Sequence, residues 1–78
     1  MQENQLIHEF QKNANEKVRA EFCEYKGRDL FNLRVFFQSD NSNEEWIPSR
    51  KGITMSIGLI PELKETIDKA FKEWEKKK

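Results

Sequence analysis

The segment from Tyr25 to Phe37 constrains the fold of this chain more than any other part of the sequence. It begins with a basic turn around Gly27 and continues into a run of aromatic, branched and leucine side chains. Such residues favour the pleated, half-buried surface of a sheet, so the run predicts a β-strand. Its polar exceptions, Asn32 and Arg34, have the same parity, so one face of the strand is predicted to be polar and the other apolar.

The chain has 78 residues, which suffices for one domain, residues 1–78, with a thin core. Cys23 and His8 are each the single residue of their type, so we expect no intrachain disulfide, no metal site and no cofactor. Domains of this size often gain stability by self-association. Because no stretch is long and apolar enough for a signal peptide or a membrane span, we expect a soluble, cytoplasmic protein without a membrane partner.

The charge balance is neutral, with 14 lysines and arginines against 14 aspartates and glutamates. On composition alone this argues against a nucleic-acid binder, because such domains usually carry a basic excess. The distribution is uneven, however. Cations mark the segment 26–51, whereas many of the acids lie in the N-terminal segment and in the last 17 residues. A local basic surface is therefore compatible with zero net charge.

Alternation of apolar and polar residues predicts a strand at 17–25 that pairs antiparallel with the strand at 30–38. Gly27 can adopt the positive φ that the tight turn between them demands. Upstream, residues 6–10 could form a short strand, and the polar stretch 11–16 is expected to be a loop. The segment 1–16 is thus expected to be an N-terminal arm or a short strand.

The middle of the chain is expected to contain two further short strands. A loop is predicted at 39–43, where Asn, Asp and Ser cluster. A strand at 44–47 would then be ended by Pro48 or placed by it at a sheet edge. A basic turn is predicted at 49–52, followed by an alternating strand at 52–57.

From Ile60 onward the apolar residues recur at helical spacing, with charged residues between them. Pro61 suits the first turn of a helix, and the lysines at the end suit its negative pole. Strands followed by one amphipathic helix predict an α+β domain in which the helix covers one face of an antiparallel sheet of four to five strands. The apolar stripe reaches Phe71 and Trp74, which could complete the core of one chain or form a dimer contact. We favour the dimer.

Four motifs resemble the positive cofactor four family of transcriptional coactivators, in particular its short bacterial and phage members. They are Glu-Tyr-Lys-Gly-Arg from Glu24, Leu-Phe-Asn-Leu-Arg-Val-Phe-Phe from Leu30, Ile-Pro-Ser-Arg-Lys-Gly-Ile-Thr-Met from Ile47 and Glu-Leu-Lys-Glu from Glu62. They occur in the family's order and span about residues 18–71. The Pro-x-Arg-Lys-Gly-Ile-Ser/Thr segment is the most specific part of the resemblance.

The resemblance implies a homodimer whose curved antiparallel sheets bind single-stranded DNA with little sequence preference. The family's DNA-binding positions fall on Tyr25, Lys26, Arg28, Arg34, Phe37, Arg50 and Lys51. Its dimer interface of C-terminal helices would fall on Leu63, Ile67, Phe71 and Trp74. Two departures weaken the match. Phe37 stands where the family has a larger stacking tryptophan, and cationic positions of its first strand fall on Val18 and Cys23, with Arg19 a candidate to compensate.

The residues themselves support a single-strand binder, because sequence-tolerant binding needs cations for the phosphates and rings for the bases. Trp46, near the middle of the predicted interface, could stack on a base or cover a sheet edge. Phe37 has the parity of Val35 and could be a core residue, unless a bulge near the strand end turns it outward.

Arg34 has two further candidate roles. It could contact DNA, or it could pair across strands with Glu21 or Glu45.

We therefore predict a non-enzymatic single-stranded DNA-binding protein in transcription regulation or in the protection of melted DNA, associated with the nucleoid. The transcription machinery is a further candidate partner. The sequence contains no nucleophile–base pair, phosphate loop or metal cluster that would indicate catalysis. The alternative is a dimeric protein-interaction module that does not bind nucleic acid.

Overall fold

The computed structural model describes residues 4–38 and 45–77, and the loop predicted at 39–43 lies outside these residues. Four strands form one sheet in the order β1-β2-β3-β4, with each neighbouring pair antiparallel. The strands are β1 (Gln5–Asn13), β2 (Glu16–Tyr25), β3 (Arg28–Phe37) and β4 (Ile47–Ser56). A 3-10 turn, η1 (Ile57–Leu59), leads into the helix α1 (Ile60–Lys76). The predicted α+β class, with one antiparallel sheet and one C-terminal helix, is confirmed.

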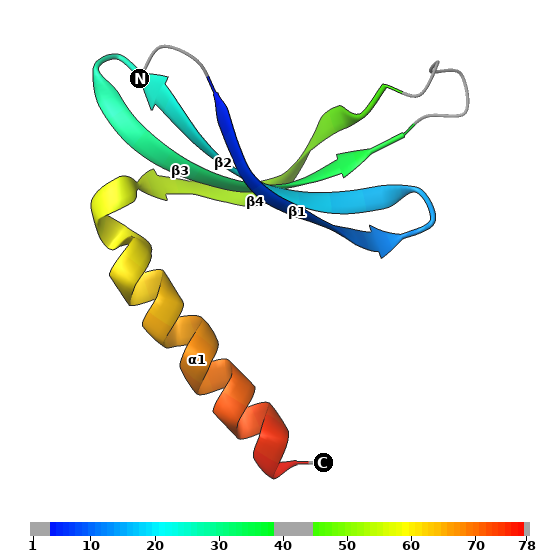
Figure 1. Cartoon of the computed structure of the whole chain (residues 1–78), viewed down its shortest axis with the longest axis vertical. Helices are drawn as coiled ribbons and strands as arrows, with labels where there is room; N and C mark the ends of the chain where they lie inside the picture. Colours follow the sequence, from blue (N-terminus) through cyan, green and yellow to red (C-terminus); the bar gives the residue numbers. More distant parts are fainter. Residues whose placement is uncertain (1–3, 39–44, 78) are drawn as a thin grey trace.

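The sheet is strongly curved, and α1 leaves the end of β4 and extends away from it (Figure 1). The expectation that the helix covers one face of the sheet is therefore wrong for a single chain. Among the described residues α1 contacts mainly η1. Its apolar stripe remains open, since the side chains of Ile67, Phe71 and Trp74 are all more than half exposed. No helix in the described part of the chain has the length and apolar character needed to cross a membrane.

The β2–β3 hairpin creates two chemically different faces. Val18 lies opposite Val35 and Phe22 lies opposite Phe31, as the alternation predicts. We call the side with these residues the apolar face; it comprises Val18, Ala20, Phe22, Phe31, Leu33, Val35, Ile53 and Met55. We call the other side the polar face; it comprises Glu9, Lys17, Arg19, Glu21, Asn32, Arg34, Phe36 and Thr54. Phe36 is the one apolar side chain that is buried among the described residues, so a single chain has almost no core.

The turn between β2 and β3 has two residues, and both have positive φ: 52° at Lys26 and 78° at Gly27. This is the backbone of a type I′ turn, which matches the twist of the flanking strands. The predicted tight turn at Gly27 is confirmed. Its neighbour Lys26 occupies the left-handed region without the freedom of a glycine.

β4 differs from the prediction. The strand predicted at 52–57 is confirmed as far as Ser56, but it extends back to Ile47. The basic turn at 49–52 is therefore wrong. The separate strand at 44–47 is also wrong, because Glu45 and Trp46 lie before β4 and outside any strand. Pro48 is tolerated because β4 is an edge strand, where a missing N–H need not break a ladder.

A bulge in β4 accommodates the segment that was predicted to be a basic turn, residues 49–52. Gly52 lies opposite Arg34 and Pro48 lies opposite Phe36, so three residues of β4 oppose a single residue of β3. The hydroxyl of Ser49 secures the bulge by donating to the Val35 carbonyl oxygen at 2.8 Å and accepting from the Lys51 N–H at 3.1 Å.

β1 is longer than the short strand considered at 6–10, and the expected loop at 11–16 is wrong. The loop shrinks to a tight turn in which the Asn13 side chain accepts a hydrogen bond from the Asn15 N–H at 2.9 Å. Alternation is hard to recognise in β1 because it is an edge strand whose side chains are mostly exposed.

Replacing Gly52 with alanine is expected to destabilise the protein by about 1–3 kcal/mol, the usual cost of overpacking. A Cβ at this position would lie 2.6 Å from the Leu33 carbonyl oxygen and 2.8 Å from the Arg34 Cα, and backbone atoms cannot easily yield. Urea unfolding at one fixed protein concentration would measure the change. Gly58→Ala is the matched control, because its nearest neighbour would be the Ser56 Oγ at 3.8 Å. Equal stabilities of the two variants would contradict the prediction.

Candidate nucleic-acid interface

Two arginines face each other across β2 and β3 at the centre of the polar face. Arg19 lies directly opposite Arg34. The Arg34 guanidinium donates to the Ser49 carbonyl oxygen at 3.0 Å and to the Thr54 hydroxyl at 3.3 Å, so the bulge and β4 fix its orientation. Like charges directly opposite each other repel, and a bound anion would relieve that repulsion. Of the two cross-strand partners considered for Arg34, Glu21 lies opposite Asn32 instead, and Glu45 lies before β4, outside the paired strands.

Aromatic rings lie beneath neighbouring cations on the same face. The Arg19 guanidinium carbon is 4.2 Å from the centroid of the Phe36 ring, and the Lys17 Nζ is 4.5 Å from that of Trp46. Both distances are within the range of a cation–π interaction. Trp46 is half-buried and lies just before β4, not within a strand as expected. The polar face thus combines the two kinds of group that single-strand binding requires.

β1 places a carboxylate on these cations. The Glu9 Oε1 is 2.6 Å from the Lys17 Nζ and 3.7 Å from the Arg19 Nη2. A hydrogen bond from Lys17 is the main cause that lowers the pKa of Glu9; the charges of Arg19 and Lys17 act in the same direction and partial burial acts against them. Sequence reasoning missed Glu9, Lys17 and Phe36. Lys17 has the strand parity of Arg19, and Phe36 has that of Arg34, so alternation was a usable signal for these two residues. The position of Glu9, in contrast, depends on the register of β1.

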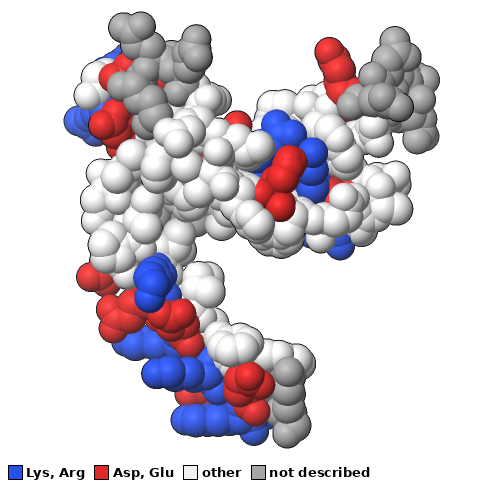
Figure 2. Space-filling view, viewed as in Figure 1, with Lys and Arg blue, Asp and Glu red and all other residues white. Residues whose placement is uncertain are grey.

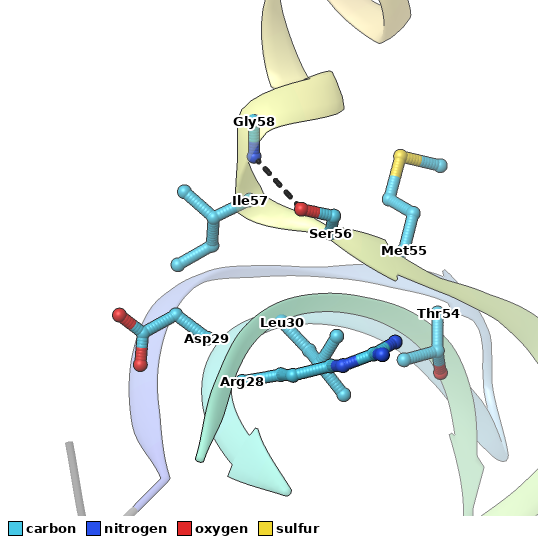
Figure 3. Close-up of a pocket in the computed structure, with 8 residues that line it drawn as sticks. All are labelled: Arg28, Asp29, Leu30, Thr54, Met55, Ser56, Ile57 and Gly58. Carbon is cyan, nitrogen blue, oxygen red and sulfur yellow. Dashed lines mark hydrogen bonds between the residues drawn. The ribbon is translucent and has the colours of Figure 1, made fainter.

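The tip of the β2–β3 hairpin presents a second group of cations and a ring. Tyr25 is 62% exposed, and the Lys26 Nζ is 5.3 Å from the centroid of its ring. Arg28 lies opposite Tyr25 and lines a depression of about 640 Å³ between β3, β4 and η1. Figure 3 shows the Arg28 side chain extending along the sheet toward Thr54. Strand parity places Tyr25 and Arg28 on the polar face with Arg34.

Three of the predicted DNA-binding residues lie elsewhere. Phe37 is half-buried on the side of Val35, because the bulge lies in β4 and leaves the pairing of β3 with β2 regular. Arg50 and Lys51 are exposed in the bulged part of the edge strand, and Lys51 borders an apolar-face depression of about 320 Å³. The structure thus brings Tyr25, Lys26, Arg28, Arg34 and Trp46 to the polar face and its hairpin tip. Contacts of Phe37, Arg50 and Lys51 with DNA stay a prediction.

The predicted dimer residues lie along one side of α1. Leu63 is half-buried, and Ile67, Phe71 and Trp74 are exposed. Uncharged side chains line the side of the helix that points toward the space below the sheet, whereas lysines and glutamates gather on its outer side (Figure 2). The role of Leu63, Ile67, Phe71 and Trp74 in a dimer interface stays a prediction.

Fold and site together define a small α+β domain with a curved four-stranded sheet, one face of which carries cations over aromatic rings. Residues 12–66 match the family model of Transcriptional Coactivator p15 (PC4), and the chain therefore belongs to the PC4 family. This family binds single-stranded DNA, dimerises and coactivates transcription.

Solved structures have the same fold. A PC4 homologue from Burkholderia pseudomallei K96243 is similar in its tetragonal crystal form, with a TM-score of 0.79, 22% identity and coverage of 87% of this chain and 97% of that chain. Its orthorhombic form gives a TM-score of 0.81, 23% identity and coverage of 90% and 92%. The bacteriophage T5 homologue of the eukaryotic coactivator PC4, implicated in recombination-dependent DNA replication, gives a TM-score of 0.61, 24% identity and coverage of 91% and 75%. No curated protein matches the chain.

Proposed function

We propose that this protein is a homodimer that binds single-stranded DNA on its polar face with little sequence preference. The observation that carries the proposal is the row of cations and rings on that face, from Lys17 over Trp46 to Lys26 beside the exposed ring of Tyr25 at the hairpin tip. Cations follow the phosphates, and rings stack on bases of any sequence. Membership of the PC4 family supports the proposal independently.

The polar face also has the extent that a bound strand needs. Tyr25 and Lys17 are eight residues apart on β2, which corresponds to about 27 Å at the usual rise of a strand. Arg19 and Arg34 lie between these two ends on the same side of the sheet, and Arg28 lies opposite Tyr25 at one end. A track of this length can contact several nucleotides.

Zero net charge does not oppose this function, because several acids of the helix have their own cationic partners. Ion pairs join Lys64 to Asp68 and Lys69 to Glu65, each at 3.3 Å, on the exposed surface of α1. They lie outside the polar face, and salt screens their effect at a distance.

The cellular role proposed here is transcription regulation or the protection of melted DNA, in the cytoplasm at the nucleoid. The implication of the bacteriophage T5 homologue in recombination-dependent replication supports a role where DNA strands are unpaired. Binding of the transcription machinery is a further part of the proposal.

A fluorescence-anisotropy titration tests the proposal, with a labelled oligo-dT strand compared with a duplex of the same length at two salt concentrations. We expect tight binding of the single strand and much weaker binding of the duplex. The logarithm of the single-strand affinity should fall with the logarithm of the salt concentration, by about 0.7 for each phosphate contacted. Absence of single-strand binding at low salt would refute the proposal and favour a protein-interaction module.

A further inference from the structure

We infer that Glu9 is an internal competitor for phosphate at a subsite formed by Lys17 and Arg19, so that β1 sets the affinity of the polar face for single-stranded DNA. The inference rests on the proposed function and assigns to one residue the control of that same face. The ligand that competes with Glu9 is a phosphodiester group of the strand.

The geometry of the carboxylate matches that of a bound phosphate. Glu9 lies directly opposite Arg19, and both of its oxygens approach the Lys17 ammonium, at 2.6 and 3.2 Å. A carboxylate and a phosphodiester offer the same kind of charged acceptor to lysine and arginine donors. While Glu9 pairs with the Lys17 ammonium and lies beside Arg19, a phosphate meets a partly neutralised site.

The subsite has donor capacity left for a larger anion. The Arg19 Nε is buried and has no hydrogen-bond partner among the described residues, and the Arg19 Nη2 is 3.7 Å from the carboxylate, beyond hydrogen-bond distance. The side chains of Lys17, Arg19 and Glu9 are 16%, 21% and 28% exposed, so solvent and a ligand can still reach all three. A phosphate with two free oxygens could satisfy the donors that Glu9 leaves unused.

The ring beneath Lys17 links the subsite to base stacking. Lys17 is held between the Glu9 carboxylate and the face of Trp46. If a phosphate displaces Glu9, the ammonium can follow the phosphate and the indole face becomes available to the adjoining base. Stacking on an aromatic ring tolerates any base, which agrees with binding of low sequence preference.

Glu9 belongs to a part of the chain that lies outside the family match. That match begins at residue 12, whereas β1 begins at Gln5 and brings Glu9 to β2 by strand pairing. The competitor is therefore a feature of this chain's own N-terminal strand.

The test compares Glu9→Gln with Glu65→Gln for binding of the labelled oligo-dT strand at two salt concentrations. Both changes remove one negative charge, but Glu65 lies on α1 and pairs with Lys69. Glu9→Gln is expected to bind about fivefold more tightly than wild type, which corresponds to the upper end for a partly exposed ion pair. The slope of the logarithm of its affinity against the logarithm of the salt concentration should steepen by about 0.7, the value for one more phosphate contact. Glu65→Gln should match wild type in both affinity and slope.

Lys17→Gln completes the comparison. With Glu9 present it is expected to change the affinity by less than about twofold, because Lys17 is already neutralised; in the Glu9→Gln background it should cost about fivefold. If Glu9→Gln does not fold, judged by far-ultraviolet circular dichroism, the change in affinity caused by Lys17→Gln alone still decides. A large loss of affinity in the single Lys17→Gln variant would overturn the inference.

The possible failures are distinguishable. If neither wild type nor Glu9→Gln binds the single strand, the proposed function fails and the inference fails with it. If wild type binds and Glu9→Gln behaves like Glu65→Gln, the inference alone fails.

Discussion

Replacing Phe71 with aspartate is expected to leave the protein largely monomeric and much less stable. One chain buries almost no apolar side chain, while its apolar face and the stripe on α1 remain open. A domain of this size cannot be stable without covering such surfaces. Since the PC4 family dimerises, a second copy is the natural cover. Truncating a buried phenylalanine costs about 3–5 kcal/mol, and a symmetric dimer would incur this cost twice, with an added charge in the interface.

Sedimentation equilibrium and circular dichroism over a range of protein concentrations would measure this effect. Lys72→Asp is the matched control, because it places the same side chain on the adjoining, charged side of α1. The control should remain a dimer. A Phe71→Asp protein that stays dimeric with wild-type stability would show that the helix stripe is not the interface.

Replacing Tyr25 with alanine is expected to lower the affinity for single-stranded DNA by roughly 5- to 160-fold, the range that about 1–3 kcal/mol of base stacking represents. Tyr25 is 62% exposed at the hairpin tip. The ring is mostly exposed and lies near only the Lys26 ammonium, so removing it takes away little buried area. The free energy of unfolding should therefore hardly change.

Tyr25→Phe separates the ring from the hydroxyl and should bind nearly as well as wild type. Anisotropy with the oligo-dT strand measures both variants, and thermal unfolding checks their stability. Wild-type affinity of Tyr25→Ala would exclude the hairpin tip from the binding surface. Phe37→Ala, on the opposite side of the sheet, tests the remaining predicted ring in the same assay.

Most of the fold could be predicted where the periodicity of the residues is strong. The alternation of β2 and β3 and the helical spacing from Ile60 predicted the right elements, because each of these elements carries its apolar residues on one side. β4 was divided wrongly, because Pro48 and a Ser-Arg-Lys-Gly sequence have the composition of a turn. At a sheet edge a bulge can absorb these residues without ending the strand.

The candidate site was predicted less completely than the fold. The hairpin tip and Arg34 could be predicted from motifs, and the structure places them on or beside one face. The contacts of Glu9 with Lys17 and Arg19 could not, because they depend on the register of an edge strand with little alternation. Likewise, the choice between Phe36 and Phe37 depends on which strand contains the bulge.

The backbone of Lys26 has a consequence for directed evolution of this protein. At φ 52° a lysine is less favourable than asparagine or glycine, which a type I′ turn prefers. Selection for heat resistance alone would therefore favour replacement of Lys26, at the cost of a cation beside Tyr25. Libraries selected for stability would need a parallel selection for binding of single-stranded DNA, because heat resistance and DNA binding favour different residues at position 26.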